Sequence, residues 1–429
     1  MKESGIDWIG QIPEEWEVTR IKNIVSIERG ASPRPIDKFI SDDDTGVNWI
    51  RIGDTYKGNK YITSTKLKIT NRGKQFSRYI HPGTLILSNS MSFGEPYISS
   101  IYGCIHDGWL SLAPYKNISK EYLYWLLLSD VCTSQFNLVS IGAVVENLSV
   151  DKVGNTLVSM PYSLSEQQKI ADFLDKKTAQ LDKAKALLEE QIQKLKDYRA
   201  SLIYETVTKG LDKTVPMKDS GIDWIGQVPE GWGVIKFKHL GDVKQGLTYS
   251  PSDIVDKDEG ILVLRSGNIQ NGILDFNNNV YVKTKVAESI LLRKNDILIT
   301  ARNGSSALIG KNAIIDTDIK ATFGAFMMVF RANKSLFAKF AFYLMNVSFN
   351  FYRTFFTTST VNQLTAAIFN GIEVPLPSIY EQKKITDFLD GKTVQIDKLI
   401  QIKNQQIENI NKQRQTLIYD YVTGKRRVY

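Results

Sequence analysis

The chain has 429 residues, a formal net charge of +8 and a pI of about 9.1. Hydrophobic residues make up 42% and charged residues 23%, as in a soluble globular protein of two or three domains. No apolar run is long enough to span a membrane, the first residues lack the features of a signal peptide, and two cysteines exclude a disulfide framework. We expect a cytoplasmic protein, and the basic balance favours a polyanionic partner modestly.

A segment at the start of the chain returns near its middle. Residues 2–16 read KESGIDWIGQIPEEW and residues 218–232 read KDSGIDWIGQVPEGW, so 12 of 15 positions are identical. We call these two segments the openers. We expect their four tryptophans to pack at the joint between each opener and a helix. They are Trp8, Trp16, Trp224 and Trp232.

The body that follows the first opener has the pattern of a mixed α/β domain. Short β-like runs such as VNWIRIG (47–53) and GTLILSNS (83–90) alternate with turn signals. A short helical stretch, KEYLYWLLLS, covers 120–129. These elements predict one globular body before the next long segment begins.

Residues 163–210 predict one long helix. Ser163 and Glu166 have the spacing of a capping box, and Gly210 suits the helix end. At 1.5 Å per residue the helix would be roughly 60 Å long. Leucines recur every seven residues and predict a heptad seam, at Leu174, Leu181, Leu188, Leu195 and Leu202.

The second half repeats this plan. SEQQKIADFLDKKTAQLDK (165–183) returns as YEQKKITDFLDGKTVQIDK (380–398), with 13 of 19 positions identical. The second helix has its own capping box at Ser378 and Glu381, and Lys403 interrupts its seam. The chain is therefore a tandem duplication. We expect domains at 1–162, 163–210, 211–377 and 378–429.

Two amphipathic helices of equal length and phase are most simply explained if they pair with each other. An antiparallel pair would bring the residues after Gly424 near Met1. The alternative is two independent long helices, each packed on its own domain. We expect the paired form: an α/β (α+β) fold in which two globular mixed α/β domains are separated by two long helices, with an antiparallel intramolecular coiled coil and pseudo-two-fold symmetry.

The two bodies are less alike than the helices. Divergent bodies on a duplicated scaffold suggest two recognition heads that read different ligands. The chain has no P-loop, no Pro-Pro of an amino-methyltransferase motif and no Pro-Asp of a nuclease motif, so we expect a binding protein rather than an enzyme. Faint matches between the bodies align Gly30 with Gly246, Arg51 with Arg265, and Gly108 with Gly324.

The openers with [IV]-P-E-x-W, the E-Q-x-K-I-x-x-F-L-D helix starts and the two-body, two-helix plan resemble the specificity (S) subunit of type I restriction-modification systems. The resemblance implies that each body is a target recognition domain which reads one half of a bipartite, asymmetric DNA site. It also implies that the paired helices set the spacer between the half-sites and dock two methyltransferase (M) subunits, and through them restriction (R) subunits.

The same resemblance implies the partners and cofactors. Double-stranded DNA, two M subunits and R subunits would be the partners, in a prokaryotic cytoplasm and without a membrane. S-adenosylmethionine, ATP and Mg²⁺ would be bound by the partner subunits, and no cofactor by this chain. Because the bodies carry little net positive charge, we expect the isolated chain to bind DNA weakly.

Base reading needs forked donors and acceptors on loops at strand ends, and phosphate binding needs basic residues near turns. We expect the loops 88–94 and 300–306 to contact DNA, with plain hairpin loops as the alternative. Arg51 and Arg265 would serve equally well as structural ion-pair partners. The DNA-binding candidates are Arg34, Lys38, Arg51, Asn89, Ser90 and Ser92 in the first body, and Lys244, Gln245, Arg265, Asn268, Arg302, Asn303, Ser305 and Lys311 in the second.

Two other functions remain open at this point. The chain would also suit a free-standing, two-headed DNA-binding regulator, or a protein-interaction scaffold with no role on DNA. Co-purification of two methyltransferase copies per chain would favour the S subunit, and tight DNA binding by the chain alone would favour the regulator.

Overall fold

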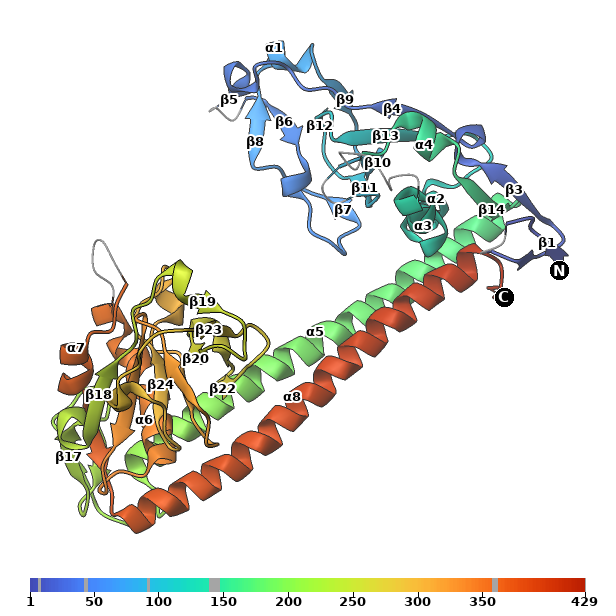
Figure 1. Cartoon of the computed structure of the whole chain (residues 1–429). Helices are drawn as coiled ribbons and strands as arrows, with labels where there is room; N and C mark the ends of the chain where they lie inside the picture. Colours follow the sequence, from blue (N-terminus) through green and yellow to red (C-terminus); the bar gives the residue numbers. More distant parts are fainter. Residues whose placement is uncertain (7–8, 42–44, 91–92, 139–146, 357–361, 429) are drawn as a thin grey trace. The chain divides into compact units, whose positions relative to one another are not determined.

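A computed structural model describes residues 1–6, 9–41, 45–90, 93–138, 147–356 and 362–428 of the chain (Figure 1). The chain divides into two compact units. The first comprises Met1–Glu189 and Asn404–Tyr429, and the second comprises Glu190–Lys403. Each unit therefore contains one body together with part of each long helix. These helices are α5 (Leu164–Lys209) and α8 (Ile379–Val422).

Both long helices begin where the capping motifs predict. In α8 the Glu381 amide donates to Ser378 Oγ at 3.3 Å, and the Ser378 amide donates to Glu381 Oε2 at 3.2 Å. In α5 the Glu166 amide donates to Ser163 Oγ at 3.3 Å. These bonds give partners to amide groups that the first turn of a helix cannot pair within itself.

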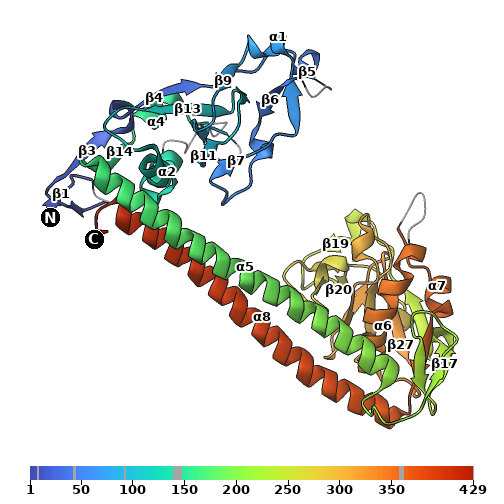
Figure 2. The ribbon, with the colours of Figure 1, turned by 180° about the vertical axis from the view of Figure 1, so that it is seen from behind.

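Within each unit the two long helices run antiparallel. In the first unit the ring centroids of Phe173 of α5 and Tyr421 of α8 lie 4.4 Å apart, and further along α5 Asp182 lies 3.6 Å from Arg414 of α8. In the second unit Lys403 Nζ of α8 donates to Gln191 Oε1 of α5, and further along α5 Arg199 lies 3.7 Å from Asp397 of α8. In each unit the residue number therefore rises along α5 and falls along α8. The predicted antiparallel pairing is therefore confirmed in both units (Figures 1 and 2).

The first body is built around two sheets. Their strand orders are β4-β13-β10-β11-β7 and β5-β8-β6-β12-β9. Within them, β7 joins β11 in parallel and β6 joins β12 in parallel. The strands are β4 (Val25–Arg29), β5 (Ile40–Ser41), β6 (Val47–Ile50), β7 (Tyr61–Ile62), β8 (Leu67–Ile69), β9 (Arg78–Ile80), β10 (Leu85–Ser88), β11 (Pro96–Ser99), β12 (Gly103–Ile105) and β13 (Trp109–Pro114).

The second body repeats this plan with four strands in each sheet instead of five. Their orders are β18-β27-β24-β25 and β19-β23-β20-β26, and the pair β20 and β26 is parallel like β6 and β12. The strands are β18 (Gly241–Gln245), β19 (Ile254–Val255), β20 (Ile261–Leu264), β23 (Val280–Val282), β24 (Ile297–Thr300), β25 (Asn312–Ile314), β26 (Ala321–Phe323) and β27 (Met327–Ala332), with a small ribbon of β21 (Ile269–Gln270) and β22 (Ile273–Leu274).

Shorter elements connect each body to its opener. The opener strands are β1 (Lys2–Glu3) with β2 (Gln11–Ile12), and β15 (Met217–Asp219) with β16 (Gln227–Pro229). Two further ribbons join the start of a body to its end: β3 (Trp16–Arg20) with β14 (Leu157–Pro161), and β17 (Gly233–Lys236) with β28 (Glu373–Leu376). The short helices are α1 (Asn71–Lys74), α2 (Lys120–Leu128), α3 (Asp130–Leu138), α4 (Val150–Gly154), α6 (Ala338–Tyr352) and α7 (Ala366–Gly371).

The openers lie at the helix ends, as predicted. Trp16, Trp224 and Trp232 are buried in the cores of their units, whereas Trp8 lies outside the described residues. In the first unit the ion pair of Arg427 with Glu15 brings the end of the chain to the first opener (Figure 1). The predicted approach of the residues after Gly424 to the start of the chain is therefore confirmed.

Candidate nucleic-acid interface

Three turns meet at one place in the first body. They follow β4, follow β10, and connect β12 to β13. The Asn89 amide donates to the Gly108 carbonyl and Asn89 Nδ2 donates to the Asp107 carbonyl, each at 2.9 Å. Ser32 Oγ donates to Asp107 Oδ1 at 2.8 Å. Asn89, at the start of the loop 88–94 that we expected to contact DNA, is thus bonded to the turn between β12 and β13, and that turn is bonded to the turn after β4.

Glycine allows two of these turns to touch. A Cβ atom on Gly30 would lie 2.0 Å from the His106 carbonyl oxygen, closer than any side chain can approach. In the second body a Cβ atom on Gly246 would lie 2.1 Å from the Gly324 carbonyl oxygen. The same close approach in both bodies accounts for the faint match of Gly30 with Gly246.

This geometry corrects another of the predicted matches. Arg29 pairs with Leu110 in one body, and Gln245 pairs with Met328 in the other. Since Arg29 and Gln245 directly precede the matched glycines, Leu110 and Met328 are equivalent. Counting back along each strand, Gly324 then corresponds to His106. The expected match of Gly324 with Gly108 is therefore wrong. The segment from Gly246 to Met328 in the second body is two residues longer than the segment from Gly30 to Leu110 in the first.

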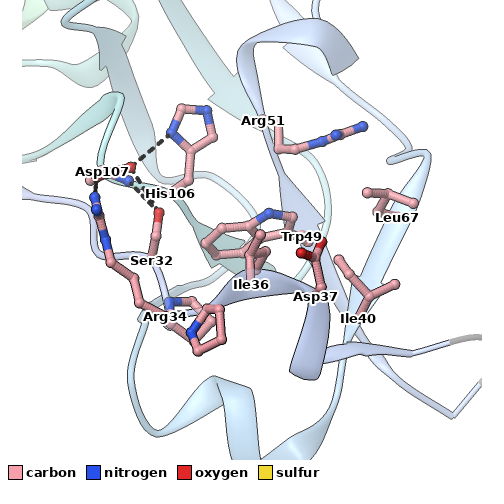
Figure 3. A pocket seen from close by; sticks show the side chains of 12 residues that line it. Ser32, Arg34, Ile36, Asp37, Ile40, Trp49, Arg51, Leu67, His106 and Asp107 are labelled. Carbon is pink, nitrogen blue, oxygen red and sulfur yellow. Dashed lines mark hydrogen bonds and ion pairs between the residues drawn. The ribbon is translucent and has the colours of Figure 1, made fainter.

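The first and third of these turns line a hollow of about 820 Å³ in the first body (Figure 3). Its wall combines apolar side chains with two arginines and two aspartates. Trp49 is 3% exposed and forms part of the wall. The lining residues are Ser32, Pro33, Arg34, Pro35, Ile36, Asp37, Ile40, Trp49, Arg51, Leu67, His106 and Asp107.

The two arginines of this hollow differ in how they are held. Arg34 Nη2 donates to Asp107 Oδ2 at 2.9 Å, and the Arg34 side chain is 80% exposed. Arg51 Nε lies 3.9 Å from Asp54 Oδ2 and has no hydrogen-bond partner within the described ranges. Figure 3 shows the Arg34–Asp107 pair and the Arg51 guanidinium apart from each other. The hollow therefore presents the donor Arg34 beside the acceptor Asp107 and, apart from this pair, the Arg51 guanidinium.

Burial and hydrogen bonds set the charges in this hollow. Burial acts to raise the pKa of Asp107, but the hydrogen bonds from Ser32 and Arg34 act against it, and the pKa of that carboxyl lies below its ordinary value. Burial lowers the pKa of His106, although Asp107 acts to raise it. Near neutral pH the hollow thus holds an ionised carboxylate beside a neutral imidazole.

The equivalent turns of the second body carry different side chains. The amides of Ala301 and Arg302 donate to the Phe326 carbonyl at 2.9 and 3.0 Å. Arg302 Nη2 donates to Gln363 Oε1 at 2.8 Å, and the Arg302 guanidinium carbon lies 5.7 Å from the centroid of the Phe326 ring. Phe326 is 61% exposed. An arginine, an amide and an aromatic ring therefore share one exposed surface.

A matched backbone contact holds the loop after β10 and the loop after β24. The Leu148 amide donates to the Asn89 carbonyl at 2.9 Å, and the Leu364 amide donates to the Ala301 carbonyl at 2.8 Å. The two bodies therefore support their loops through the same frame while the side chains on the loops differ.

Arg51 and Arg265 mark the same turn in both bodies. The Arg51 amide donates to Asp54 Oδ2 and the Arg265 amide donates to Asn268 Oδ1, each at 2.9 Å. The Arg265 guanidinium also donates to the Asn278 carbonyl at 3.2 Å. In both bodies the side chain three residues after the arginine thus caps the turn, and in the first body that side chain, Asp54, also forms an ion pair with Arg51.

The candidate residues from the sequence differ in exposure. Asn89 and Asn268 are buried and support local turns, so neither side chain offers a surface to DNA in this structure. Ser92 lies outside the described residues. Arg34, Lys38, Gln245, Arg265, Arg302 and Ser305 are exposed, and Arg51, Ser90, Lys244, Asn303 and Lys311 are half-buried.

Two half-buried candidates of the second body serve local structure. Lys311 Nζ donates to the Ser266 carbonyl at 3.2 Å, and burial lowers the pKa of Lys311. Asn303 Oδ1 accepts a bond from the Ser305 amide at 3.0 Å. The structure thus brings Arg302 and Phe326 together on the exposed part of this surface, with Lys311 set back from it.

Sequence reasoning missed the residues that complete both surfaces. Asp107 and Trp49 in the first body, and Phe326 and Gln363 in the second, were not among the candidates. Asp107 lies 73 residues from Arg34 in the sequence, and no local pattern links the two. These residues could be found as different side chains at equivalent positions of the two bodies. Equivalent positions can be matched only once the register of the strands is known.

Among the described residues no three His, Cys, Asp or Glu side chains come together in a way that could hold a metal ion. Within the same part of the chain, none of the helices combines the length and the hydrophobicity needed to cross a bilayer.

Both halves of the chain match one family model. The model for the type I restriction modification DNA specificity domain matches residues 13–196 and 229–412. These two ranges each begin in an opener and end in a long helix, so the duplication of the sequence is also a duplication of the family domain.

Individual proteins show the same relationship. The specificity subunit of the type I restriction enzyme EcoKI from Escherichia coli (strain K12) is 32% identical over 206 residues, which are 47% of this chain and 44% of that protein. The match therefore spans under half the length of that relative. The MjaVIII specificity subunit from Methanocaldococcus jannaschii is 23% identical over 427 residues, 97% of this chain and 94% of that protein.

A solved structure shares the fold. One chain of a structure described as "Structural basis underlying complex assembly and conformational transition of the type I R-M system" superposes with a TM-score of 0.77 and 15% identity, and the match covers 97% of this chain and all of that one. The match of the family model over both halves establishes that the chain belongs to the family of type I restriction-modification DNA specificity proteins.

Proposed function

We propose that the chain is the DNA specificity subunit of a type I restriction-modification complex and carries no catalytic site itself. Each body would read one half of a bipartite, asymmetric DNA site. We keep the expected division into recognition domains at 1–162 and 211–377 and long-helix segments at 163–210 and 378–429 as part of this proposal. The observation that carries it is a duplicated frame with different side chains at equivalent exposed positions.

The two bodies carry different side chains where their turns meet. The frame itself is shared, because both bodies have the close glycine contact and the capped arginine turn. Two bodies with one frame and different side chains would read two different sequences, which is what an asymmetric site requires. Divergent equivalent pairs are Arg34 and Ser250, and Asp107 and Ala325.

The exposed side chains have the chemistry of base recognition. In the major groove, arginine donates to guanine, carboxylates accept from the amino group of cytosine, and glutamine pairs with adenine. The Arg34–Asp107 pair of the first body suits a G·C pair. In the second body Arg302 and Gln363 suit guanine and adenine, and Phe326 offers an apolar surface to a thymine methyl group.

The remaining candidates suit a supporting role. Lys38, Lys244, Gln245 and Arg265 would contact phosphates, which position the protein without reading sequence. Arg51 is half-buried in the hollow, and its guanidinium would donate to a phosphate or a base edge. For Asn89, Asn268 and Lys311 we propose an indirect role through the turns they hold.

The paired helices would dock two M subunits, and R subunits through them. Exposed apolar side chains along α5 and α8 support a docking role, for example Leu187, Leu399 and Ile402, which are 49%, 46% and 47% exposed. S-adenosylmethionine, ATP and Mg²⁺ would be bound by these partners, in a prokaryotic cytoplasm. The helix pair would also hold the two half-sites at a fixed spacing.

Co-expression with the cognate methyltransferase subunit tests this function. We expect two methyltransferase copies to co-purify with each chain, and the assembly to bind a split DNA site far more tightly than the chain alone. If the chain alone bound one specific DNA sequence with nanomolar affinity at physiological salt and bound no methyltransferase, it would instead be a free-standing regulator.

A further inference from the structure

An aspartate on each long helix holds the body of its own unit. Asp175 of α5 is the last residue of the motif F-L-D. Lys60 Nζ donates to both oxygens of its carboxylate, at 2.7 Å to Oδ1 and 2.8 Å to Oδ2. Trp125 Nε1 donates to the same carboxylate at 2.9 Å. One carboxylate therefore joins the helix to two different segments of the first body.

The second copy of the motif makes the same kind of contact. Asp390 of α8 accepts from Lys339 Nζ at 2.6 Å and from Tyr343 Oη at 2.8 Å. The Tyr343 hydroxyl also lies 3.5 Å from Thr393 Oγ1, one turn further along α8. In both units a carboxylate at one helical position thus binds one lysine and one aromatic donor, and we call this arrangement the helix clamp.

The two clamps are built from partly different elements. Trp125 on α2 and Tyr343 on α6 occupy equivalent positions of equivalent helices. The lysines do not: Lys60 directly precedes β7, whereas Lys339 lies on α6, one turn before Tyr343. Duplication explains the aspartates and the aromatic donors but not the lysines. In each unit a lysine thus meets the aspartate of the long helix, but the two lysines come from different elements.

The first clamp is the more enclosed of the two. The Lys60 side chain is 13% exposed, and its ammonium lies 5.0 Å and 5.5 Å from the ring centroids of Tyr124 and Trp125. A largely buried ammonium group between aromatic rings destabilises the fold if it loses its counter-ion, which here is Asp175. The Arg414 guanidinium of α8 lies 5.9 Å from the Trp125 ring, so this clamp touches both long helices of the unit.

We infer that Asp175 and Asp390 are positioning residues for the spacing between the two half-sites. The inference rests on the proposed function, because it assumes that each body reads DNA. The aspartates contact no part of the surfaces described above. They act instead on the angle at which a body sits on its own part of the helix pair.

The angle between a body and the long helices matters because the body reads DNA at a distance from its attachment to these helices. A small change of this angle therefore displaces the DNA-reading surface. Adjacent base pairs are about 3.4 Å apart along the helix axis, and half-site spacing is a geometric property of a two-headed protein. A displacement of about 1 Å in a reacting complex can lower its rate by up to about 100-fold. If the helix clamp were loosened, the complex would therefore also bind half-sites that are one base pair closer together or further apart. Its preference for the native spacer would then fall.

The test uses the complex with the cognate methyltransferase subunits and a DNA library in which the two native half-sites are separated by spacers of different length. Asp175→Ala and Asp390→Ala are compared with Asp172→Asn and Asp387→Asn, which change exposed carboxylates at equivalent positions one turn earlier. Sequencing of the methylated products reports both the spacer length and the half-site bases.

We expect the preference for the native spacer over one that is a base pair longer or shorter to fall by about tenfold in the Asp175 and Asp390 variants, with the half-site bases unchanged. The Asp172 and Asp387 variants keep the native preference. An unchanged spacer preference in an assembled, active Asp175→Ala complex would overturn the inference, as would a change in the half-site bases.

Two milder variants keep the inference testable if Asp175→Ala does not fold. Lys60→Met retains most of the packing and removes the charge, and Trp125→Phe removes the indole donor. Broadened spacing in either supports the inference, and native spacing in both overturns it. Failure of the proposed function would look different, because the unaltered complex would then methylate no split site at all.

Discussion

Trp16 Nε1 donates to Glu166 Oε1 at 3.2 Å, and the equivalent Trp232 Nε1 donates to Glu381 Oε1 at 3.3 Å. Each opener is thus bonded to the first turn of the long helix that follows its own body. Both indole rings are buried, at 0% and 3% exposure. The opener is repeated in the sequence because both halves build the same joint between opener and helix.

Removal of this joint should weaken the fold. We expect Trp16→Phe to lower the free energy of unfolding by about 1–3 kcal/mol, because it removes a hydrogen bond to a carboxylate and part of a buried ring. Glu166→Gln keeps an acceptor for the indole and should cost less. Urea denaturation of the full chain, followed by circular dichroism, measures both. Equal stability of Trp16→Phe and the unaltered chain would contradict the role given to the joint.

The glycine contact between the turns gives a second prediction. Gly30→Ala would place a methyl group 2.0 Å from the His106 carbonyl oxygen, so the turns must separate. We expect a loss of about 1–3 kcal/mol in the free energy of unfolding. Gly53→Ala is the matched control, since a Cβ there meets no atom within 4 Å. Equal melting temperatures for the two variants would show that the close approach is not needed.

The Arg34–Asp107 pair predicts a change of specificity. We expect Arg34→Ala and Asp107→Asn to lower discrimination at one base pair of one half-site by about 1–3 kcal/mol, because each removes one partner of a base contact. Competition binding of the assembled methyltransferase to DNA with each base substituted in turn measures this. Lys22→Ala, an exposed change elsewhere in the same body, should leave the specificity unchanged. Uniform weakening on all sequences would assign Arg34 to a phosphate instead.

His106 predicts a dependence of stability on pH. Burial lowers its pKa in the folded chain below the ordinary value of about 6.5, which the unfolded chain retains. As the pH falls below about 6.5, the unfolded state therefore binds a proton before the folded state does, and the folded state loses stability. Above that pH the effect is absent.

His106→Asn should reduce this acid sensitivity, because asparagine can still accept the bond that the Gly108 amide makes to the imidazole but does not titrate. Melting temperatures between pH 7.5 and pH 5 compare this variant with the unaltered chain and with His81→Asn, which changes an exposed histidine. A slope that is the same in all three proteins would contradict a half-buried His106 that stays neutral in the folded chain.

The architecture was largely readable from the sequence, because it is encoded by short-range signals and by repetition. Ser378 and Glu381 lie three residues apart, and the heptad seam needs no knowledge of the rest of the fold. The pairing of the two long helices followed from their equal length and phase. The antiparallel direction, which the family resemblance implies, agrees with the contacts of Phe173 with Tyr421 and Asp182 with Arg414 in the first unit.

The recognition surfaces were less readable, since their partners are far apart in sequence. Asp107 is fixed by Ser32 and Arg34 across more than seventy residues, and a search for local motifs sees none of this. Asn89 was chosen because it stands on a polar loop, but its side chain points into the fold and holds the Asp107 carbonyl. Burial of that kind depends on how the turns meet.

The central claim is that each body reads its own half of a split DNA site. Its most direct test is single-molecule sequencing of methylated adenines in DNA modified by the assembled complex, with Arg34→Ala and Arg302→Ala compared with the unaltered chain. We expect a bipartite motif in which Arg34→Ala relaxes one half and Arg302→Ala relaxes the other. A continuous motif, or a change of both halves by either variant, would contradict it.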